Sequence, residues 1–294
     1  MKKLGFIGAG NMAEALIRGL LAGHVVRTSD LIASDIDRGR LQRLKRIFKI
    51  DVTNSNAEVV RGAQALLIAV KPQTIDEVLV QLKAAAEFSG SNDSTRRRVR
   101  GAQTKGAPSP VVLEKRLFIS IAAGITIERL NRGLGSRAHI IRVMPNAPAM
   151  VGEGMAAIVR GSAATRSDEN FALRIFNAVG DAVALKNETM LDAVTALSGS
   201  GPAYVYLFAK AMADAGVAEG LPPALALRMA LKTIRGAEIN MRQSKLDANE
   251  LIRVVASPGG TTEAALHKFA ESGFSDIVIS ALHAAAERSR ELGR

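Results

Sequence analysis

Hydroxyl side chains and a pair of glycines stand together at the start of a predicted helix, in the segment Ser257-Pro258-Gly259-Gly260-Thr261-Thr262. Glycines let the backbone turn its N–H groups toward one point, and the helix start adds unpaired N–H groups and a positive dipole end. The segment therefore indicates a site for a small anion such as a carboxylate. The alternative interpretation is an ordinary helix cap after a Pro-Gly turn.

A second glycine-rich turn lies at the N-terminus, where an apolar strand runs through Gly8-Ala9-Gly10-Asn11-Met12-Ala13 into a helix. This Gly-x-Gly-x-x-Ala spacing is a dinucleotide-binding fingerprint. A second predicted strand ends in Asp35, whose carboxylate suits the adenosine ribose hydroxyls and favours NADH. Arg38 and Arg40 follow closely and could instead attract the 2′-phosphate of NADPH.

Three further apolar segments continue the alternation of strands and helices: 65–70, 117–121 and 139–143. Turn-forming residues follow each of them. In a doubly wound sheet the ligand lies outside the carboxyl ends of the strands, so Lys71, Ala123 and Asn146 are candidate neighbours of the nicotinamide ring. Simple turn chemistry is the alternative for each residue.

The last predicted strand ends at Leu185, and the chain then becomes helical in pattern. We therefore expect a dinucleotide-binding domain over 1–188, with a Rossmann-type parallel α/β sheet, and an all-α domain over 189–294. The helices of the second domain are apolar all round over 203–217 and 277–286. Burial against another subunit accounts for that pattern.

The composition indicates a globular chain of 294 residues, 48% of them apolar, without cysteine and with a formal net charge of +11. Much of the excess charge lies in a polar insertion at about 89–112, which we interpret as a solvated loop peripheral to catalysis. No aromatic residues accompany its arginines, so we expect no nucleic-acid partner. The first strand begins at Lys3 and no apolar run is long enough to span a bilayer, so we expect no signal peptide, no membrane partner and a cytoplasmic location.

Taken together, these motifs resemble the pyrroline-5-carboxylate reductases. The resemblance covers nearly the whole chain except the insertion, and it rests on 6–13, 69–73, 122–124, 142–146, 197–204 and 257–262. It implies a Rossmann domain followed by a helical dimerisation domain, and NADPH- or NADH-dependent reduction of 1-pyrroline-5-carboxylate to L-proline. It also implies a homo-oligomer built from interlocked dimers, with the active site completed across the dimer.

The resemblance assigns residues to both ligands. Substrate would lie against Ser257, Gly259, Gly260, Thr261 and Thr262, with the hydroxyl of the catalytic Thr262 facing the ring nitrogen. A protonated imine is already electrophilic, so orientation over the nicotinamide would supply most of the catalysis and no metal is expected. The dinucleotide would lie against Gly8, Gly10, Asn11, Met12, Asp35, Asn56, Ala69, Val70, Lys71, Pro72, Ala122, Ala123, Gly124 and Asn146.

One departure from the family pattern keeps alternatives open. Several members have a glutamate about twelve residues before the motif serine, followed by His-Pro; an ungapped alignment places Lys245 at the glutamate and Ala248 at the proline. A paralogue that reduces another imine, or a non-catalytic dinucleotide-binding protein, is therefore an alternative. A β-hydroxyacid dehydrogenase is a further one, although it needs a lysine soon after the glycine-rich turn, and Lys210 is the first after Gly201.

Overall fold

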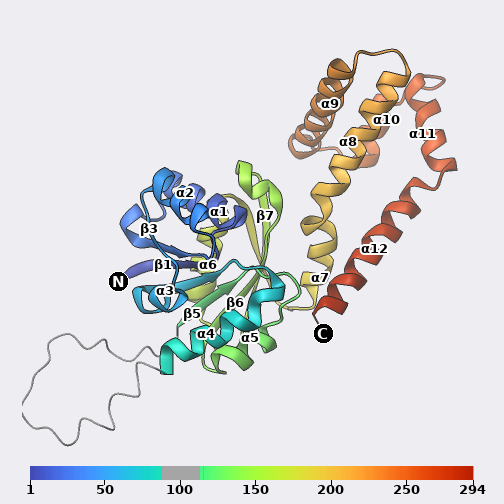
Figure 1. The fold of residues 1–294 in the computed structure, drawn as a ribbon. Coiled ribbons are helices and arrows are strands. Elements are labelled where there is room, and N and C mark those ends of the chain that lie inside the picture. The colour runs from blue at the N-terminus through green and yellow to red at the C-terminus, as the bar shows by residue number, and fades with distance from the viewer. Residues whose placement is uncertain (88–112, 115, 294) are drawn as a thin grey trace, which may run out of the picture. The chain divides into compact units, whose positions relative to one another are not determined.

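The computed structural model of the chain describes residues 1–87, 113–114 and 116–293. They form two compact units, one comprising Met1–Gly199 with Ala286–Arg294 and the other Ser200–Ala285 (Figure 1). The contacts thus divide the chain at Gly199, and the predicted domain limits at 188 and 189 stay a prediction. The predicted insertion at about 89–112 lies outside the described residues, between α4 Ile75–Glu87 and β5 Leu117–Ser120.

The first unit contains one eight-stranded sheet, in the order β3-β2-β1-β4-β5-β6-β7-β8. Neighbouring strands in this sheet are parallel except for β6 and β7, which are antiparallel, with Ile141 opposite Arg160. The antiparallel strand β7 was not anticipated from the sequence; the connection before it contains one short 3-10 helix, Ala147–Val151, too little chain for a parallel crossover. The strands are β1 Lys2–Ile7, β2 Leu31–Ser34, β3 Asp51–Thr53, β4 Ala63–Ile68, β5 Leu117–Ser120, β6 His139–Met144, β7 Gly154–Arg160 and β8 Gly180–Leu185.

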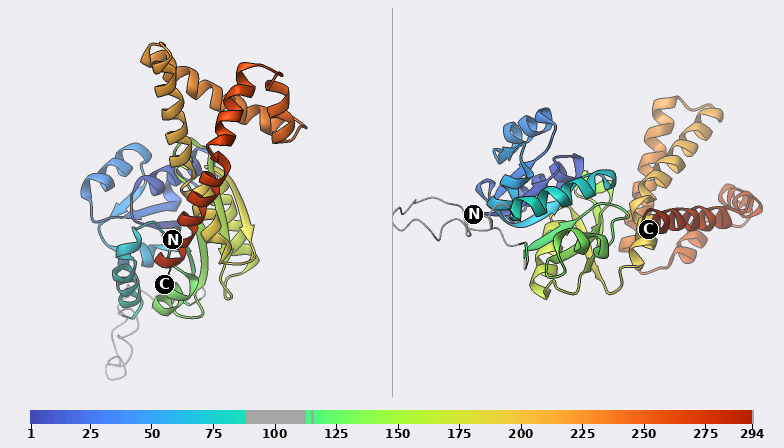
Figure 2. Two further views of the ribbon diagram at one scale, coloured as in Figure 1. Left: turned by 90° about the vertical axis from the view of Figure 1, so that its right-hand side faces the viewer. Right: turned by 60° about the horizontal axis from the view of Figure 1, so that its bottom comes forward.

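Helices cover both faces of this sheet, as two further views show (Figure 2). One core lies under α1, α2 and α6, and a second lies under α3, α4 and α5. The helices of the first unit are α1 Asn11–Ala22, α2 Arg38–Phe48, α3 Asn56–Gly62, α4 Ile75–Glu87, α5 Ile127–Leu134, α6 Arg166–Asn177 and α7 Met190–Val194.

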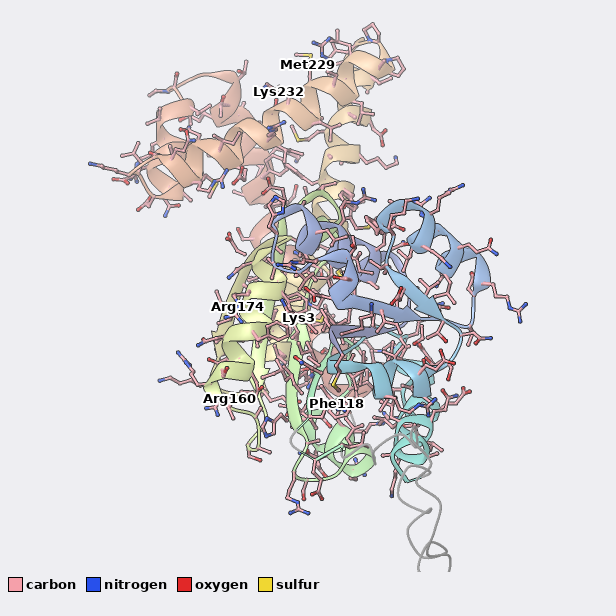
Figure 3. All side chains as sticks on the ribbon, turned by 90° about the vertical axis from the view of Figure 1, so that its left-hand side faces the viewer. Lys3, Phe118, Arg160, Arg174, Met229 and Lys232 are labelled. Atoms are coloured by element: carbon pink, nitrogen blue, oxygen red, sulfur yellow. The ribbon has the colours of Figure 1, made fainter. Side chains whose placement is uncertain are left out.

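The alternation of side chains along each strand explains the two cores. Leu4 and Phe6 of β1 are fully buried in the first core, whereas Ile7 is fully buried in the second. Phe118 of β5 belongs to the second core and lies within the sheet region in Figure 3. A sheet that is buried on both faces has strands with continuous apolar sequences. Such a sheet is rigid, so it fixes the positions of the loops that follow its strands.

The second unit is helical, with α8 Gly201–Ala218, α9 Pro223–Gln243, α10 Ala248–Val255, α11 Thr261–Glu271 and most of α12 Phe274–Leu292. The ring centroid of Phe274 lies 5.2 Å from that of Phe269 and 6.3 Å from that of Phe208, which joins α12, α11 and α8. Many large apolar side chains of this unit are nevertheless exposed. Met229, which projects from α9 beside Lys232 in Figure 3, is one of them.

Candidate functional site

The carboxyl ends of the parallel strands form one continuous edge in the first unit. Backbone bonds join them directly: the Gly8 amide donates to Ser34 (2.8 Å), that of Ala69 to Ile7 (2.8 Å), and that of Ile121 to Ile68 (3.1 Å). The loops after β1, β2, β4 and β5 therefore meet, as a ligand site on a doubly wound sheet requires. The structure brings the predicted dinucleotide residues of these loops to this edge.

The first glycine turn has the geometry needed for close approach of an anion. Gly8 has a φ of +100°, and a Cβ there would lie 2.7 Å from the Ala69 carbonyl oxygen. Gly10 is the N-cap of α1 and has no side-chain cap, so the amides of Asn11, Met12 and Ala13 precede the first backbone bond of the helix, from Glu14 to Gly10. A Cβ at Gly10 would meet nothing closer than the Arg40 guanidinium at 4.0 Å. This open cradle of N–H groups fits a pyrophosphate.

Asp35 follows β2 and organises the neighbouring turns. Its carboxylate accepts from the Ala9 amide (2.6 Å) and from the Asp37 amide (2.8 Å). The side chain thereby ties the end of β2 to the glycine turn. Its predicted contact with the ribose hydroxyls stays a prediction, as does the choice between Asp35 and the nearby Arg40 in setting NADH or NADPH preference.

An ionic cluster lies beside the glycine turn and was not predicted from the sequence. Glu14 of α1 accepts from Arg43 of α2 at 2.9 and 3.1 Å and from Arg18 at 3.0 Å. The Arg43 hydrogen bonds, together with the charges of both arginines, hold the pKa of the Glu14 carboxyl below its ordinary value. The i, i+4 spacing of Glu14 and Arg18 on one helix predicts their ion pair. The contact with Arg43 joins two different helices, so no short stretch of sequence predicts it.

Asn56, at the start of α3, is held by two side chains. Its Oδ1 accepts from the buried Ser34 hydroxyl (2.7 Å), and its amide nitrogen donates to Gln81 (2.7 Å). These bonds place Asn56 next to the end of β2, beside Asp35. The residue therefore lies at the predicted dinucleotide edge, and its role in binding stays a prediction.

The loop after β4 contains Ala69, Val70, Lys71 and Pro72. Lys71 is exposed and precedes a short 3-10 turn, Pro72–Thr74, in which the Thr74 hydroxyl donates to the Lys71 carbonyl (3.0 Å). The corresponding loop after β5 carries Ala122, Ala123 and Gly124. Gly124 has a φ of +74°, a conformation that favours glycine.

Asn146 follows β6 and forms hydrogen bonds with two other segments of the chain. Its Oδ1 accepts from the Met155 amide at the start of β7 (2.8 Å), and its nitrogen donates to the carbonyl and hydroxyl oxygens of Ser198 (3.2 and 3.1 Å). Ser198 lies in a π-helical turn, Thr195–Gly199, a rare geometry that is frequent at functional sites. The structure thus shows Asn146 in a positioning role that the sequence did not suggest.

In the second unit, the anion turn precedes α11 as predicted. Gly259 has a φ of +71° and Gly260 is the N-cap of the helix, with no side-chain cap. The Gly260 amide donates to the Ser257 carbonyl (2.9 Å), and that of Gly259 to the Glu263 carboxylate (2.7 Å).

These bonds leave several donors of the turn available. The first backbone bond of α11 runs from Ala264 to Gly260, so the amides of Thr261 and Thr262 precede it. Within the described chain, no hydrogen bond engages the hydroxyls of Ser257, Thr261 or Thr262. Free hydroxyls beside unpaired helix amides can hold a carboxylate, whereas a plain helix cap would use a hydroxyl on its own backbone. Lys245 is exposed in the loop between α9 and α10.

His139 has a structural contact with a carboxylate. The His139 ring lies 2.9 Å from the Asp168 carboxylate, which also accepts from the amide and hydroxyl of Thr165. Burial by itself raises the pKa of Asp168, but these hydrogen bonds hold it below its ordinary value. Over the described ranges there is no group of three His, Asp or Glu residues that could hold a metal ion. None of the helices in the described part of the chain has the length and apolar character needed to cross a bilayer.

Comparison with known proteins agrees with this arrangement. Residues 188–292 match the family model for pyrroline-5-carboxylate reductase dimerisation, and residues 3–90 match that for NADP oxidoreductase, coenzyme F420-dependent. A pyrroline-5-carboxylate reductase of Pisum sativum is 37% identical, over 98% of this chain and 95% of its own. One of Methanosarcina acetivorans is 38% identical, over 100% and 98%.

Solved structures show the same relationship. The crystal structure of Plasmodium falciparum pyrroline carboxylate reductase with NADP bound superposes with a TM-score of 0.82 at 30% identity. The match covers 100% of this chain and 98% of that one.

Proposed function

The chain belongs to the pyrroline-5-carboxylate reductase family, and we propose that it reduces 1-pyrroline-5-carboxylate to L-proline with NADPH or NADH. Similarity over the full length of both chains includes both units. The observation that carries the proposal is the turn Ser257–Thr262, which offers unbonded hydroxyls and helix amides to a carboxylate. An imine that carries a carboxylate can accept hydrogen bonds from these donors, whereas an imine without a carboxylate cannot.

The reaction needs a hydride at the imine carbon and a proton on nitrogen. The dinucleotide supplies the hydride when it is bound at the edge formed by β1, β2, β4 and β5. Ser257 and the amides around Gly260 and Thr261 hold the substrate carboxylate, and the Thr262 hydroxyl faces the ring nitrogen. The chain orients the two reactants rather than providing strong acid catalysis.

We further propose that the oligomer consists of interlocked dimers and that the active site is completed across the dimer. The match of 188–292 to a dimerisation family and the exposed apolar side chains of the second unit support this arrangement. In it, the turn Ser257–Thr262 of one chain meets the dinucleotide edge of the other. The cytoplasmic location expected from the sequence stays a prediction.

One assay tests the proposed activity. Purified oligomeric protein is mixed with 1-pyrroline-5-carboxylate and either NADPH or NADH, and nicotinamide absorbance and L-proline are followed together. We expect oxidation of at least one dinucleotide with stoichiometric proline. Binding of dinucleotide without oxidation would favour a non-catalytic protein, and turnover of a different cyclic imine alone would favour a paralogue.

A further inference from the structure

The last turn of α12 lies against the loop that follows β5. A Cβ added at Gly124 would lie 3.1 Å from both the Cβ and the carbonyl oxygen of Leu292, and one added at Gly293 would lie 3.3 Å from the Gly124 carbonyl oxygen. Gly124 is buried in this contact. The end of the chain therefore rests directly on the backbone of the loop Ala122–Gly124.

A buried hydrogen bond anchors this turn. The Ser289 hydroxyl donates to the Asp192 carboxylate of α7 at 2.7 Å, and Ser289 is only 4% exposed. A buried hydroxyl needs a partner, so the bond fixes the rotation of the helix end as well as its position. In agreement, Ala286–Arg294 belongs to the first unit although α12 begins in the second.

The opposite end of the same loop is also fixed. Arg142, 7% exposed, donates to Glu188 at 2.6 Å, and the same Glu188 oxygen accepts from the Ile127 amide at 2.8 Å. The ion pair thus holds the start of α5, where the loop ends. The loop is thus held by contacts at both of its ends.

We propose that Ser289 and Leu292 are positioning residues that hold the loop Ala122–Gly124 in the conformation that receives the nicotinamide half of the dinucleotide. The assignment of this loop to the dinucleotide rests on the proposed function. A loop at a ligand site binds best when its conformation is already set, because less ordering free energy opposes binding. Release of the α12 turn should therefore weaken dinucleotide binding without touching the anion turn Ser257–Thr262.

The test compares direct dinucleotide binding, by nicotinamide fluorescence or calorimetry, in the wild type and in variants of the protein. A stop codon after Ser289 removes Leu292, Ser289→Ala and Asp192→Ala remove the anchor, and Asp192→Asn keeps an oxygen acceptor. We expect the Kd for the preferred dinucleotide to rise roughly fivefold in Ser289→Ala and Asp192→Ala, the loss of one ordinary hydrogen bond. The truncated chain should also bind more weakly, because it lacks the contact of Leu292 with Gly124. Asp192→Asn should remain close to wild type, and the double Ala variant should be no worse than either single one.

Glu291→Gln is the matched control, since this residue lies in the same turn and its carboxylate accepts from the exposed Arg288 (2.6 Å). An unchanged Kd in folded Ser289→Ala and Asp192→Ala, or an equal rise in Glu291→Gln, would overturn the inference. A lower thermal midpoint with unchanged Kd would show that the turn only stabilises the fold, and also overturns it. Binding is measured without imine, so a wild type that binds dinucleotide but makes no proline contradicts the proposed function alone.

Discussion

At the scale of single residues, Gly8 and Gly10 differ in what they do. Gly8 is required by the backbone, because its φ is +100° and the Ala69 carbonyl occupies the position of a side chain. Gly10 has an ordinary extended conformation and open space in front of it. The first glycine therefore serves folding, and the second leaves room for ligand.

We expect Gly8→Ala to lower the free energy of unfolding by about 1–3 kcal/mol or more, the usual cost of a strained backbone. Gly10→Ala should leave stability close to wild type and weaken dinucleotide binding, because its methyl group projects where the pyrophosphate approaches. Chemical denaturation and fluorescence titration measure the two effects. Normal dinucleotide affinity in Gly10→Ala would contradict the assignment of this turn.

The anion turn gives a second prediction at this scale. Ser257→Ala and Thr262→Ala should each lower kcat/KM for the imine by roughly 10- to 150-fold, the loss of about 1.5–3 kcal/mol from one hydrogen bond to a charged group. Dinucleotide affinity should not change. Ser272→Ala, at the other end of α11, is the control. Unchanged efficiency in both variants would show that the turn is only a helix cap.

At the scale of elements, the ionic cluster of Glu14 joins α1 to α2. The hydrogen bonds from Arg43 lower the pKa of Glu14 from its ordinary value of 4.5. A carboxyl whose pKa is lower in the folded state stabilises the fold above the unfolded pKa. That stabilisation is lost as the pH falls from 4.5 through the lowered folded value.

We therefore expect the thermal midpoint of the wild type to fall more steeply than that of Glu14→Gln as the pH is lowered from about 6 to about 3. The difference between the two proteins should be largest at neutral pH and shrink with acidification. Calorimetry at several pH values measures it. A difference that does not depend on pH would mean that Glu14 acts by packing rather than by charge.

At the scale of the whole molecule, the second unit leaves a large apolar surface uncovered within one chain. A groove of about 910 Å³ runs between α8, α9 and α12, lined mostly by apolar side chains. Among them, Leu207 is 69% exposed and Ile277 is 61% exposed. Surfaces of this kind are usually buried against a partner, in line with the dimerisation family that this region matches.

Ile277→Glu should therefore dissociate the oligomer, because a charge buried in an apolar interface is strongly unfavourable. Sedimentation analysis should show smaller particles, with loss of imine reduction if the active site is completed across the dimer. Ser167→Glu adds the same charge to an exposed position of α6 and is the matched control. An oligomer of unchanged size in Ile277→Glu would place the subunit interface elsewhere.

Features with local signals could be predicted from the amino-acid sequence alone. Strand and helix periods, the glycine turn at Gly8–Gly10 and the turn Ser257–Thr262 are short runs of chain, so the Rossmann-type sheet, the helical second part and the family were predictable from them. The predicted strand ends do come together, because parallel strands place all their carboxyl ends at one edge. The individual ligand contacts of these residues stay predictions.

Contacts between segments that are distant in the sequence became known only from the folded structure. Asn146 bonds to Ser198, Arg43 to Glu14, and the turn of Ser289 and Leu292 rests on Gly124. Strand β7 likewise runs antiparallel to β6, a direction that its apolar pattern does not encode. Each of these arrangements depends on how the whole sheet and its helices pack. Residues that are far apart in the chain follow no common periodicity or spacing, so the sequence alone does not predict that they are in contact.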